Sequence, residues 1–254
     1  MLKVLVAEIC SEITVVNAFG NLNSENPKLL GQGTFPTTVQ EGDISLGVKQ
    51  AMADLEKEIG PWGSITDMPF YAVYPIQFEG LNSKGIASNY FNEGILPASE
   101  AMMIAVQLIY EEVGDVLVLK LEEESITVYS VTSNSLPLVE SHSTNRNKHI
   151  KTKPETSEEI ALRAELTAEA LKAAVKSYCE LSIHFRWIVG TGSSLTELPN
   201  GLQILTESVK GIESQGETAI LLDRDCLMTS LGALTANYRQ GAWQLLRESM
   251  GVEN

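Results

Sequence analysis

Apolar residues cluster in two similar blocks of the chain, and each block predicts a β-hairpin. In residues 3–20, β-favouring apolar runs flank the short polar segment 10–12, which is long enough only for a tight turn. Residues 116–131 repeat this arrangement. With a one-residue gap, residues 4–6 align with 116–118 and residues 13–15 align with 126–128. We interpret the match as a duplicated domain, although shared β-propensity alone would produce part of it.

Helical spacing of apolar residues follows each hairpin. It predicts helices over residues 44–59 and 97–112, with Asp43 as the N-cap of the first. Thr156 and Glu159 have the spacing of a capping box and start a third long helix. The remaining pattern predicts strands over residues 28–33, 70–74, 76–78, 184–189 and 218–222, helices over 202–209, 226–237 and 241–250, and an exposed loop or ragged hairpin over 136–153.

Composition narrows the class of protein. The chain has 254 residues, 44% of them hydrophobic, and we expect a globular protein with a substantial core. We find no apolar run of the roughly 18 residues that a membrane helix needs, and no signal peptide before the first strand. Three widely spaced cysteines, at positions 10, 179 and 226, favour reduced thiols and a cytoplasmic location.

Net charge and the positions of the histidines argue against nucleic-acid and membrane partners and against a zinc site. The formal net charge is −15, which disfavours nucleic acids and anionic membranes because contacts to phosphate need lysine and arginine. His142, His149 and His184 have no carboxylate or cysteine at ligand spacing, so we expect no zinc site. We expect His184 to start a core strand as a hydrogen-bonded polar residue.

The order of elements predicts the fold class. A hairpin and helix, a second hairpin and helix, and then a strand, glycine turn and helix indicate an α/β protein of the actin-like, sugar-kinase-like (ribonuclease H-like) duplicated fold. We expect an N-terminal half at 1–112 and a C-terminal half at 113–254. Residues 62–96 would be the remnant of an inserted subdomain.

The chain also resembles a narrower family, the methylaspartate (glutamate) mutase accessory proteins, which are kin to the diol dehydratase reactivase ATPases. The resemblance lies in six blocks in family order: residues 7–20, 27–51, 95–103, 114–131, 187–201 and 221–234. It implies an ATP-driven chaperone that exchanges damaged cobalamin for intact cofactor on an adenosylcobalamin-dependent mutase. It also implies that ATP binds between the halves, with Mg²⁺ held by carboxylates and hydroxyls.

Both phosphate turns of this chain depart from the family pattern. The first pattern is acidic residue, apolar, Gly, Ser, Thr; Glu8 and Ser11 are retained, whereas Cys10 replaces the glycine and Glu12 the threonine. The second pattern is Asp, apolar, Gly, Gly, small, Thr, Thr, Asp. This chain has Lys120, Leu121, Glu122, Glu123, Glu124, Ser125, Ile126 and Thr127 there. Both glycines, which would let backbone N–H groups approach a phosphate, are absent.

These departures predict that ATP hydrolysis is lost. Two unit charges about 4 Å apart repel by about 1 kcal/mol in bulk water, and by more where water is excluded. Three adjacent glutamates would therefore oppose a polyphosphate unless Mg²⁺ or arginine intervened. If residues 122–124 are instead a solvated turn tip, no phosphate loop is left.

The candidate site residues come from the three turns, and we expect no catalytic residue. If nucleotide binding is retained, the candidates are Glu8, Ser11, Thr14, Ser125, Thr127, Gly190, Thr191, Gly192 and Ser193. Glu8 is the one candidate metal ligand, and ATP with Mg²⁺ is the candidate cofactor. Residues 190–193 could face an anion or a purine edge, or form a plain turn. Asp223 and Asp225 could cap the next helix.

Three functions follow from this sequence. The first is a degenerate, non-hydrolysing accessory protein of a cobalamin mutase system. The second is a working reactivase ATPase, and the third is a small-molecule kinase of the same superfamily. We also expect a homodimer, because loss of the inserted subdomain would uncover apolar surface near residues 62–74.

Overall fold

The structure, a computed structural model, describes residues 3–37, 44–61, 68–75, 91–144, 156–180, 183–212 and 218–252. The chain forms two compact units, each described here by itself. The first unit comprises Met1–Ala105 and Met228–Leu246, and the second comprises Val106–Leu227 and Arg247–Asn254. The division expected from the sequence, 1–112 and 113–254, assigns residues 228–246 to the C-terminal half, whereas they pack in the first unit.

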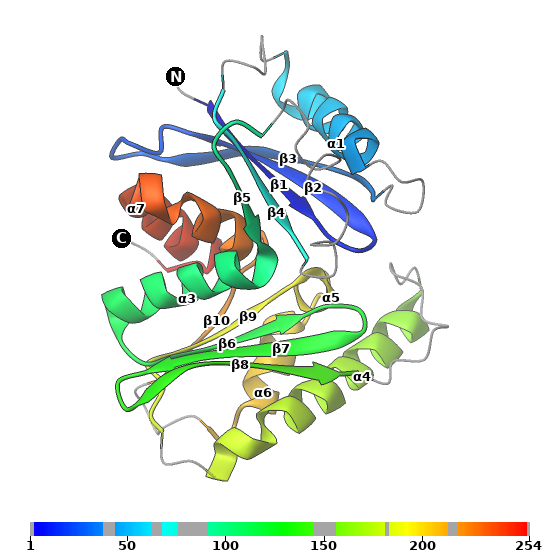
Figure 1. Cartoon of the computed structure of the whole chain (residues 1–254). Coiled ribbons are helices and arrows are strands. Elements are labelled where there is room, and N and C mark those ends of the chain that lie inside the picture. The colour runs from blue at the N-terminus through cyan, green and yellow to red at the C-terminus, as the bar shows by residue number, and fades with distance from the viewer. Residues whose placement is uncertain are drawn as a thin grey trace. The chain divides into compact units, whose positions relative to one another are not determined.

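The first unit contains a five-stranded mixed sheet (Figure 1). Its strands are β1 (Lys3–Ile9), β2 (Ile13–Gly20), β3 (Lys28–Pro36), β4 (Phe70–Tyr74) and β5 (Gly94–Pro97), in the order β3-β2-β1-β4-β5. β1 to β3 are antiparallel neighbours, and β4 and β5 run parallel to β1. Helix α1 (Ile44–Ile59) buries Val48, Ala51 and Leu55 in the same core as Leu5 and Phe70.

The second unit contains a sheet with the same plan. Its strands are β6 (Val116–Leu121), β7 (Ser125–Thr132), β8 (Ser135–Ser143), β9 (Trp187–Thr191) and β10 (Ala219–Leu222), in the order β10-β9-β6-β7-β8. Its helices are α4 (Ser157–Val175), the 3-10 turn η4 (Lys176–Glu180), α5 (Ser193–Thr196) and α6 (Gly201–Ser208). Its core includes Leu119, Leu171, Phe185 and Leu205.

Two long helices contain residues of both units. α3 spans Ala98–Val113 and α7 spans Met228–Ser249. Within α7, Tyr238 has non-helical backbone angles, with φ −138° and ψ 40°. α7 therefore consists of two helical segments that meet at a kink, and the kink lies between the two closing helices predicted over 226–237 and 241–250.

The two sheets match strand for strand, which supports the predicted duplication. In both, the second and third strands are antiparallel to their neighbours and the fourth and fifth are parallel. Ile9 pairs with Thr14 at the end of the first hairpin, and Leu121 pairs with Ile126 at the end of the second. The hairpins thus align without the one-residue gap that we inferred from the sequence, and Thr14 corresponds to Ile126 rather than to Thr127.

Most predicted elements are present, with two corrections. Residues 135–143 form the edge strand β8, paired with β7 in a hairpin, and a hairpin was one of the two alternatives predicted for residues 136–153. β9 begins at Trp187 rather than at residue 184. His184 therefore precedes the strand, and it is exposed rather than in the core. The predictions for Asp43, His149 and the strand 76–78 lie outside the described residues. Among the helices that the structure describes, none is long and apolar enough to cross a membrane.

Candidate functional site

The β1–β2 turn uses its own polar groups to close the hairpin. The Cys10 backbone N–H donates to the Ile13 carbonyl at 3.0 Å, and the Glu12 carbonyl accepts from the Thr37 N–H at 2.8 Å. Thr14 is fully buried and its hydroxyl is hydrogen-bonded to the Thr37 hydroxyl at 2.9 Å. Of the candidates in this turn, Ser11 is exposed at the tip. The Cys10 N–H and the Thr14 hydroxyl already have partners within the first unit.

The β6–β7 turn closes with the same backbone bond. The Glu122 N–H donates to the Ser125 carbonyl at 2.9 Å, and the Ser125 hydroxyl donates to Glu122 Oε2 at 3.3 Å. Lys120 Nζ lies 2.8 Å from Glu122 Oε1, and the Lys120 side chain is only 16% exposed. The cation nearest to this turn in sequence is therefore paired with one of the turn's own carboxylates. Glu124 is exposed at the tip.

Glu8 lies in a partly buried polar cluster of the first unit. Its Oε1 accepts from the Ser230 hydroxyl and from Asn17 Nδ2, the latter at 3.4 Å. Asn17 Nδ2 also donates to Ser230 Oγ at 2.8 Å, and Asn17 Oδ1 accepts from Gln32 Nε2 at 2.8 Å. Asn17 and Ser230 are almost completely buried. Neither residue was predicted as part of a site from the sequence. For Asn17, a single amide side chain within the apolar segment 13–20 could have indicated a buried polar contact.

Glu8 has no cluster of further ligating side chains beside it in the part of the chain that the structure describes. Across those residues, no group of three or more His, Cys, Asp or Glu side chains is placed to hold an ion. Glu8 is instead oriented by a hydroxyl and an amide donor, which stabilise its carboxylate within the first unit.

Packing accounts for both glycines of the β9–α5 turn. A Cβ on Gly190 would lie 2.6 Å from Leu195 Cδ2 and 2.8 Å from Leu205 Cδ2. Gly192 has φ +96°, and a Cβ there would lie 2.1 Å from the Leu121 carbonyl oxygen. Gly192 is thus required by its backbone angle and by the end of β6, without reference to a ligand, whereas a Cβ on Gly190 would force the ends of two leucine side chains to move. Ser193 is exposed at the start of α5.

Thr191 belongs to a buried network around Asp223. The Thr191 hydroxyl donates to Asp223 Oδ2 at 2.8 Å, and the Leu227 N–H donates to Asp223 Oδ1 at 3.1 Å. The Ser249 hydroxyl donates to the same Oδ1. Asp223 is fully buried. Leu227 lies one residue before α7, so this bond fixes the segment that leads into the helix, and the predicted capping role stays a prediction. Partial burial and the Asp223 charge raise the pKa of Asp225.

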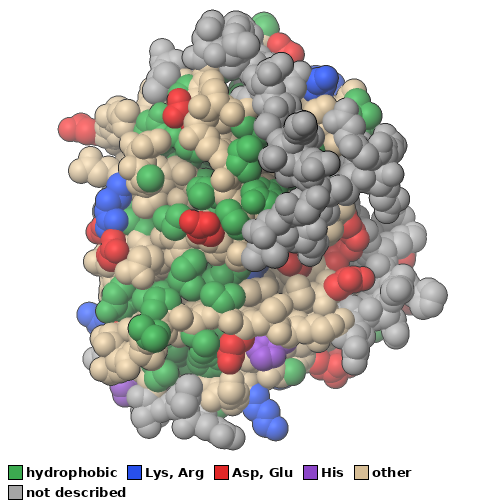
Figure 2. Space-filling model, viewed as in Figure 1, with side chains coloured by type: hydrophobic (Ala, Val, Ile, Leu, Met, Phe, Trp, Pro, Cys, Tyr) green, Lys and Arg blue, Asp and Glu red, His purple; other side chains and the backbone are tan. Residues whose placement is uncertain are grey.

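The sheet registers bring some candidates together. In the second unit, Lys120 is paired with Thr127 on β7 and with Thr191 on β9, so these three residues form one row across the sheet. The matching row of the first unit is Val15, Glu8 and Val73. Each row therefore holds one charged residue at its centre. On the face shown in Figure 2, more acidic than basic side chains reach the surface, as expected for a net charge of −15.

No protein-family model matches the chain, and no curated protein matches it. Solved structures do match. Component A of (R)-2-hydroxyglutaryl-CoA dehydratase from Acidaminococcus fermentans is 10% identical, with 95% of this chain and 100% of that chain covered and a TM-score of 0.56. The ethanolamine utilization protein EutJ from Carboxydothermus hydrogenoformans is 12% identical, with coverages of 92% and 89% and a TM-score of 0.56.

A third structure is the activator of 2-hydroxyisocaproyl-CoA dehydratase from Clostridium difficile with bound ADPNP. It is 13% identical, with 100% of this chain and 99% of that chain covered and a TM-score of 0.54. At these identities the likeness concerns the fold. With two mixed five-stranded sheets and their helices, this chain has the actin-like ATPase fold.

Proposed function

We propose that this protein is a non-hydrolysing accessory protein, of the reactivating-factor type, in an adenosylcobalamin-dependent mutase system. The proposal that the protein does not hydrolyse ATP rests on the chemistry of its two hairpin turns. Cys10 and Glu122 stand where a phosphate-binding turn would have glycine, and both use their N–H groups in the hairpin bond. The two N–H groups that would face a polyphosphate at these positions are thus used in internal hydrogen bonds, which supports the proposal.

Charge supports the same conclusion. Glu12 and residues 122–124 add four carboxylates to the two turns, and Lys120 is already paired with Glu122. Each carboxylate about 4 Å from a phosphate would cost about 1 kcal/mol in bulk water and more in a dry site. Binding of ATP is therefore disfavoured before any step of hydrolysis.

The accessory role rests on the sequence resemblance and on the fold. The six sequence blocks resemble mutase accessory proteins and reactivases. Among the matching structures, one is a component and another an activator of a dehydratase, by their names. The proposed partner is a cobalamin mutase, and the proposed form in the cytoplasm is a homodimer. A fold retained without nucleotide chemistry would serve as a binding scaffold.

Thermal unfolding with and without millimolar Mg·ATP tests the nucleotide part. A ligand that binds the folded state raises its stability by RT ln(1 + [L]/Kd), so weak or absent binding predicts an unchanged melting temperature. A matched variant, E123S/E124S, removes two tip charges and leaves the Lys120–Glu122 pair in place. A rise in the variant alone would confirm that charge excludes the nucleotide. A rise of several degrees in the wild-type protein would instead favour a working ATPase, and phosphate transfer to a sugar or acid would favour a kinase.

Reconstitution tests the accessory part. A cobalamin mutase from the same organism is inactivated with a damaged cobalamin and then incubated with intact cofactor and this protein, with or without ATP. We expect recovery of mutase activity that does not depend on ATP. No recovery and no binding to the mutase in sedimentation would contradict the accessory role, whatever the nucleotide result.

A further inference from the structure

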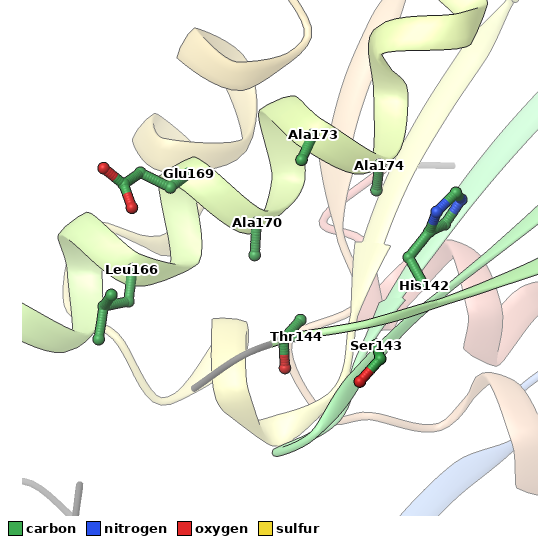
Figure 3. Close-up of a pocket in the computed structure, with 8 residues that line it drawn as sticks. All are labelled: His142, Ser143, Thr144, Leu166, Glu169, Ala170, Ala173 and Ala174. Carbon is green, nitrogen blue, oxygen red and sulfur yellow. The ribbon is translucent and has the colours of Figure 1, made fainter. Parts of the chain in front are cut away.

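The second unit contains a cavity of about 350 Å³ between the end of β8 and the middle of α4 (Figure 3). It lies beside the β6–β7 turn, because the N–H of its lining residue Thr144 donates to the Glu124 carbonyl at 2.8 Å. Its lining residues are His142, Ser143, Thr144, Leu166, Glu169, Ala170, Ala173 and Ala174. None of them is among the candidate nucleotide residues. The volume lies at the lower end of the range of small-molecule sites.

Short side chains create this space. Ala170, Ala173 and Ala174 follow one another along the side of α4 that borders the cavity, and each contributes only a Cβ. Leu166 lies one turn before Ala170 and extends the apolar wall. This wall suits an apolar body lying along the helix.

His142 lies at one end of the wall and has an unpaired ring nitrogen. Its ring lies beside Ala174 in Figure 3. Its Nε2 is buried and has no hydrogen-bond partner among the residues that the structure describes. Buried polar atoms in folded proteins nearly always have a partner, so a ligand group that can pair with this nitrogen is favoured.

Glu169 supplies charge at the other end. It lies on α4 near Leu166, and its side chain is exposed at the rim. Glu169 and Ala174 are separated by about 7.5 Å along the helix axis, given the rise per residue. The lining named above includes one carboxylate and no lysine or arginine. A cationic ligand is therefore preferred to an anionic one.

We propose that this cavity binds a small amine with an apolar body and a hydroxyl at the far end. The ammonium group pairs with Glu169, the body lies against Ala170 and Ala174, and the hydroxyl forms a hydrogen bond with His142 Nε2. This site is independent of the proposed accessory function.

Tyramine is the probe, because it has an ammonium group, an aromatic body and a phenol hydroxyl at opposite ends. Calorimetric titration of the full chain should give a dissociation constant in the millimolar range or below. Three analogues separate the contributions: 4-ethylphenol lacks the ammonium group, 2-phenylethylamine lacks the hydroxyl, and 3-(4-hydroxyphenyl)propionate reverses the charge. Each should bind more weakly than tyramine. Binding should shift the imidazole NMR signals of His142 and leave those of His184 unchanged.

Two variants of α4 test the location. Ala170→Phe fills the cavity and should abolish binding. Ala161→Phe is the matched control, because Ala161 is exposed on the same helix and does not line the cavity; it should bind tyramine as the wild type does. Glu169→Gln should weaken tyramine about two- to fivefold, the range of an exposed ion pair, and should not weaken 4-ethylphenol. His142→Phe should remove the preference for tyramine over 2-phenylethylamine.

Several results would overturn the proposal. If tyramine fails to bind the wild-type protein, or binds the Ala170→Phe variant with unchanged affinity, the cavity is excluded as its site. Tighter binding of the propionate than of tyramine excludes the assigned role of Glu169. An unchanged preference in His142→Phe excludes the assigned role of the imidazole.

Discussion

Glu8 and Lys120 occupy the same position in the two sheets, and their charges are opposite. Each is the next-to-last residue of the central strand of its unit, one residue before the pair that ends the hairpin. Each also has a partner within its own unit, because Ser230 donates to Glu8 and Glu122 pairs with Lys120. Duplication thus preserved the backbone at these positions while the side chains diverged into separate local networks.

The Glu8 network should contribute measurably to stability. Ser230→Ala removes the hydroxyl that joins Glu8 and Asn17, and leaves the partly buried Glu8 and the buried Asn17 with fewer partners. We expect a loss of about 1–3 kcal/mol in the free energy of unfolding, measured by urea denaturation. Thr235→Ala on the same helix is the control, because its hydroxyl only bonds the Leu231 carbonyl one turn earlier. It should change stability by less than about 0.5 kcal/mol, and equal effects of the two variants would contradict the prediction.

Gly192 should tolerate no side chain. Gly192→Ala combines a left-handed backbone with a Cβ 2.1 Å from the Leu121 carbonyl oxygen, so we expect destabilisation of about 3 kcal/mol or more. Gly114 has nearly the same φ, +98°, but its Cβ would be no nearer than 3.6 Å to Arg186 Cγ. Gly114→Ala should therefore cost only the backbone strain, about 1–2 kcal/mol. Similar unfolding midpoints for the two variants would show that the close approach is relieved by a backbone shift.

Substitution of the buried Asp223 should lower the free energy of unfolding far more than substitution of its exposed neighbour Asp225. Asp223→Asn weakens the bonds from Thr191, Leu227 and Ser249, and we expect a loss of about 2–3 kcal/mol at neutral pH. Asp225 already has a raised pKa, so its charged form is disfavoured in the folded state. Asp225→Asn should therefore be neutral or slightly stabilising in the same urea titration. A larger loss for Asp225→Asn than for Asp223→Asn would refute this assignment.

Tyr178 should make the protein sensitive to alkaline pH. Burial and the neighbouring Glu140, whose Oε2 accepts from the Tyr178 hydroxyl at 3.1 Å, raise the pKa of Tyr178 above its ordinary value of 10.0. Above that pH the unfolded chain loses its tyrosine proton first, so stability should fall as pH rises. Tyr178→Phe should cost about 1 kcal/mol at neutral pH through the lost hydrogen bond and then show a shallower fall above pH 10. Parallel pH curves for the variant and the wild type would exclude Tyr178 as the source.

Local features of the fold could be predicted from the sequence, because their causes lie close together in the chain. The hydroxyl of Thr156 accepts from the Glu159 N–H at 3.2 Å, and the Glu159 carboxylate accepts from the Thr156 N–H at 3.1 Å, as the spacing predicted. Helix α1 likewise has the predicted bounds, since its apolar face repeats with helical spacing.

Distant contacts could not be predicted. Glu8 and Ser230 are 222 residues apart, and no local pattern marks Ser230 as a partner. Gly232 is required because a Cβ there would lie 1.8 Å from the Ala101 carbonyl oxygen, a contact that only packing creates. β8 could be predicted only as a loop or a ragged hairpin, because its exposed side chains lack the alternation of a half-buried strand.

The packing of Gly190 and Gly192 has a consequence for how this protein's ancestry is traced. A side chain at Gly192 would collide with the Leu121 carbonyl, and one at Gly190 would press on two leucines of the same unit, so selection for stability would favour both glycines even without any cofactor chemistry. A sequence motif built on this turn would then identify proteins of common descent, but it would not indicate whether they are catalytically active. Surveys that classify chains by that pattern would count proteins without catalytic activity among the active enzymes.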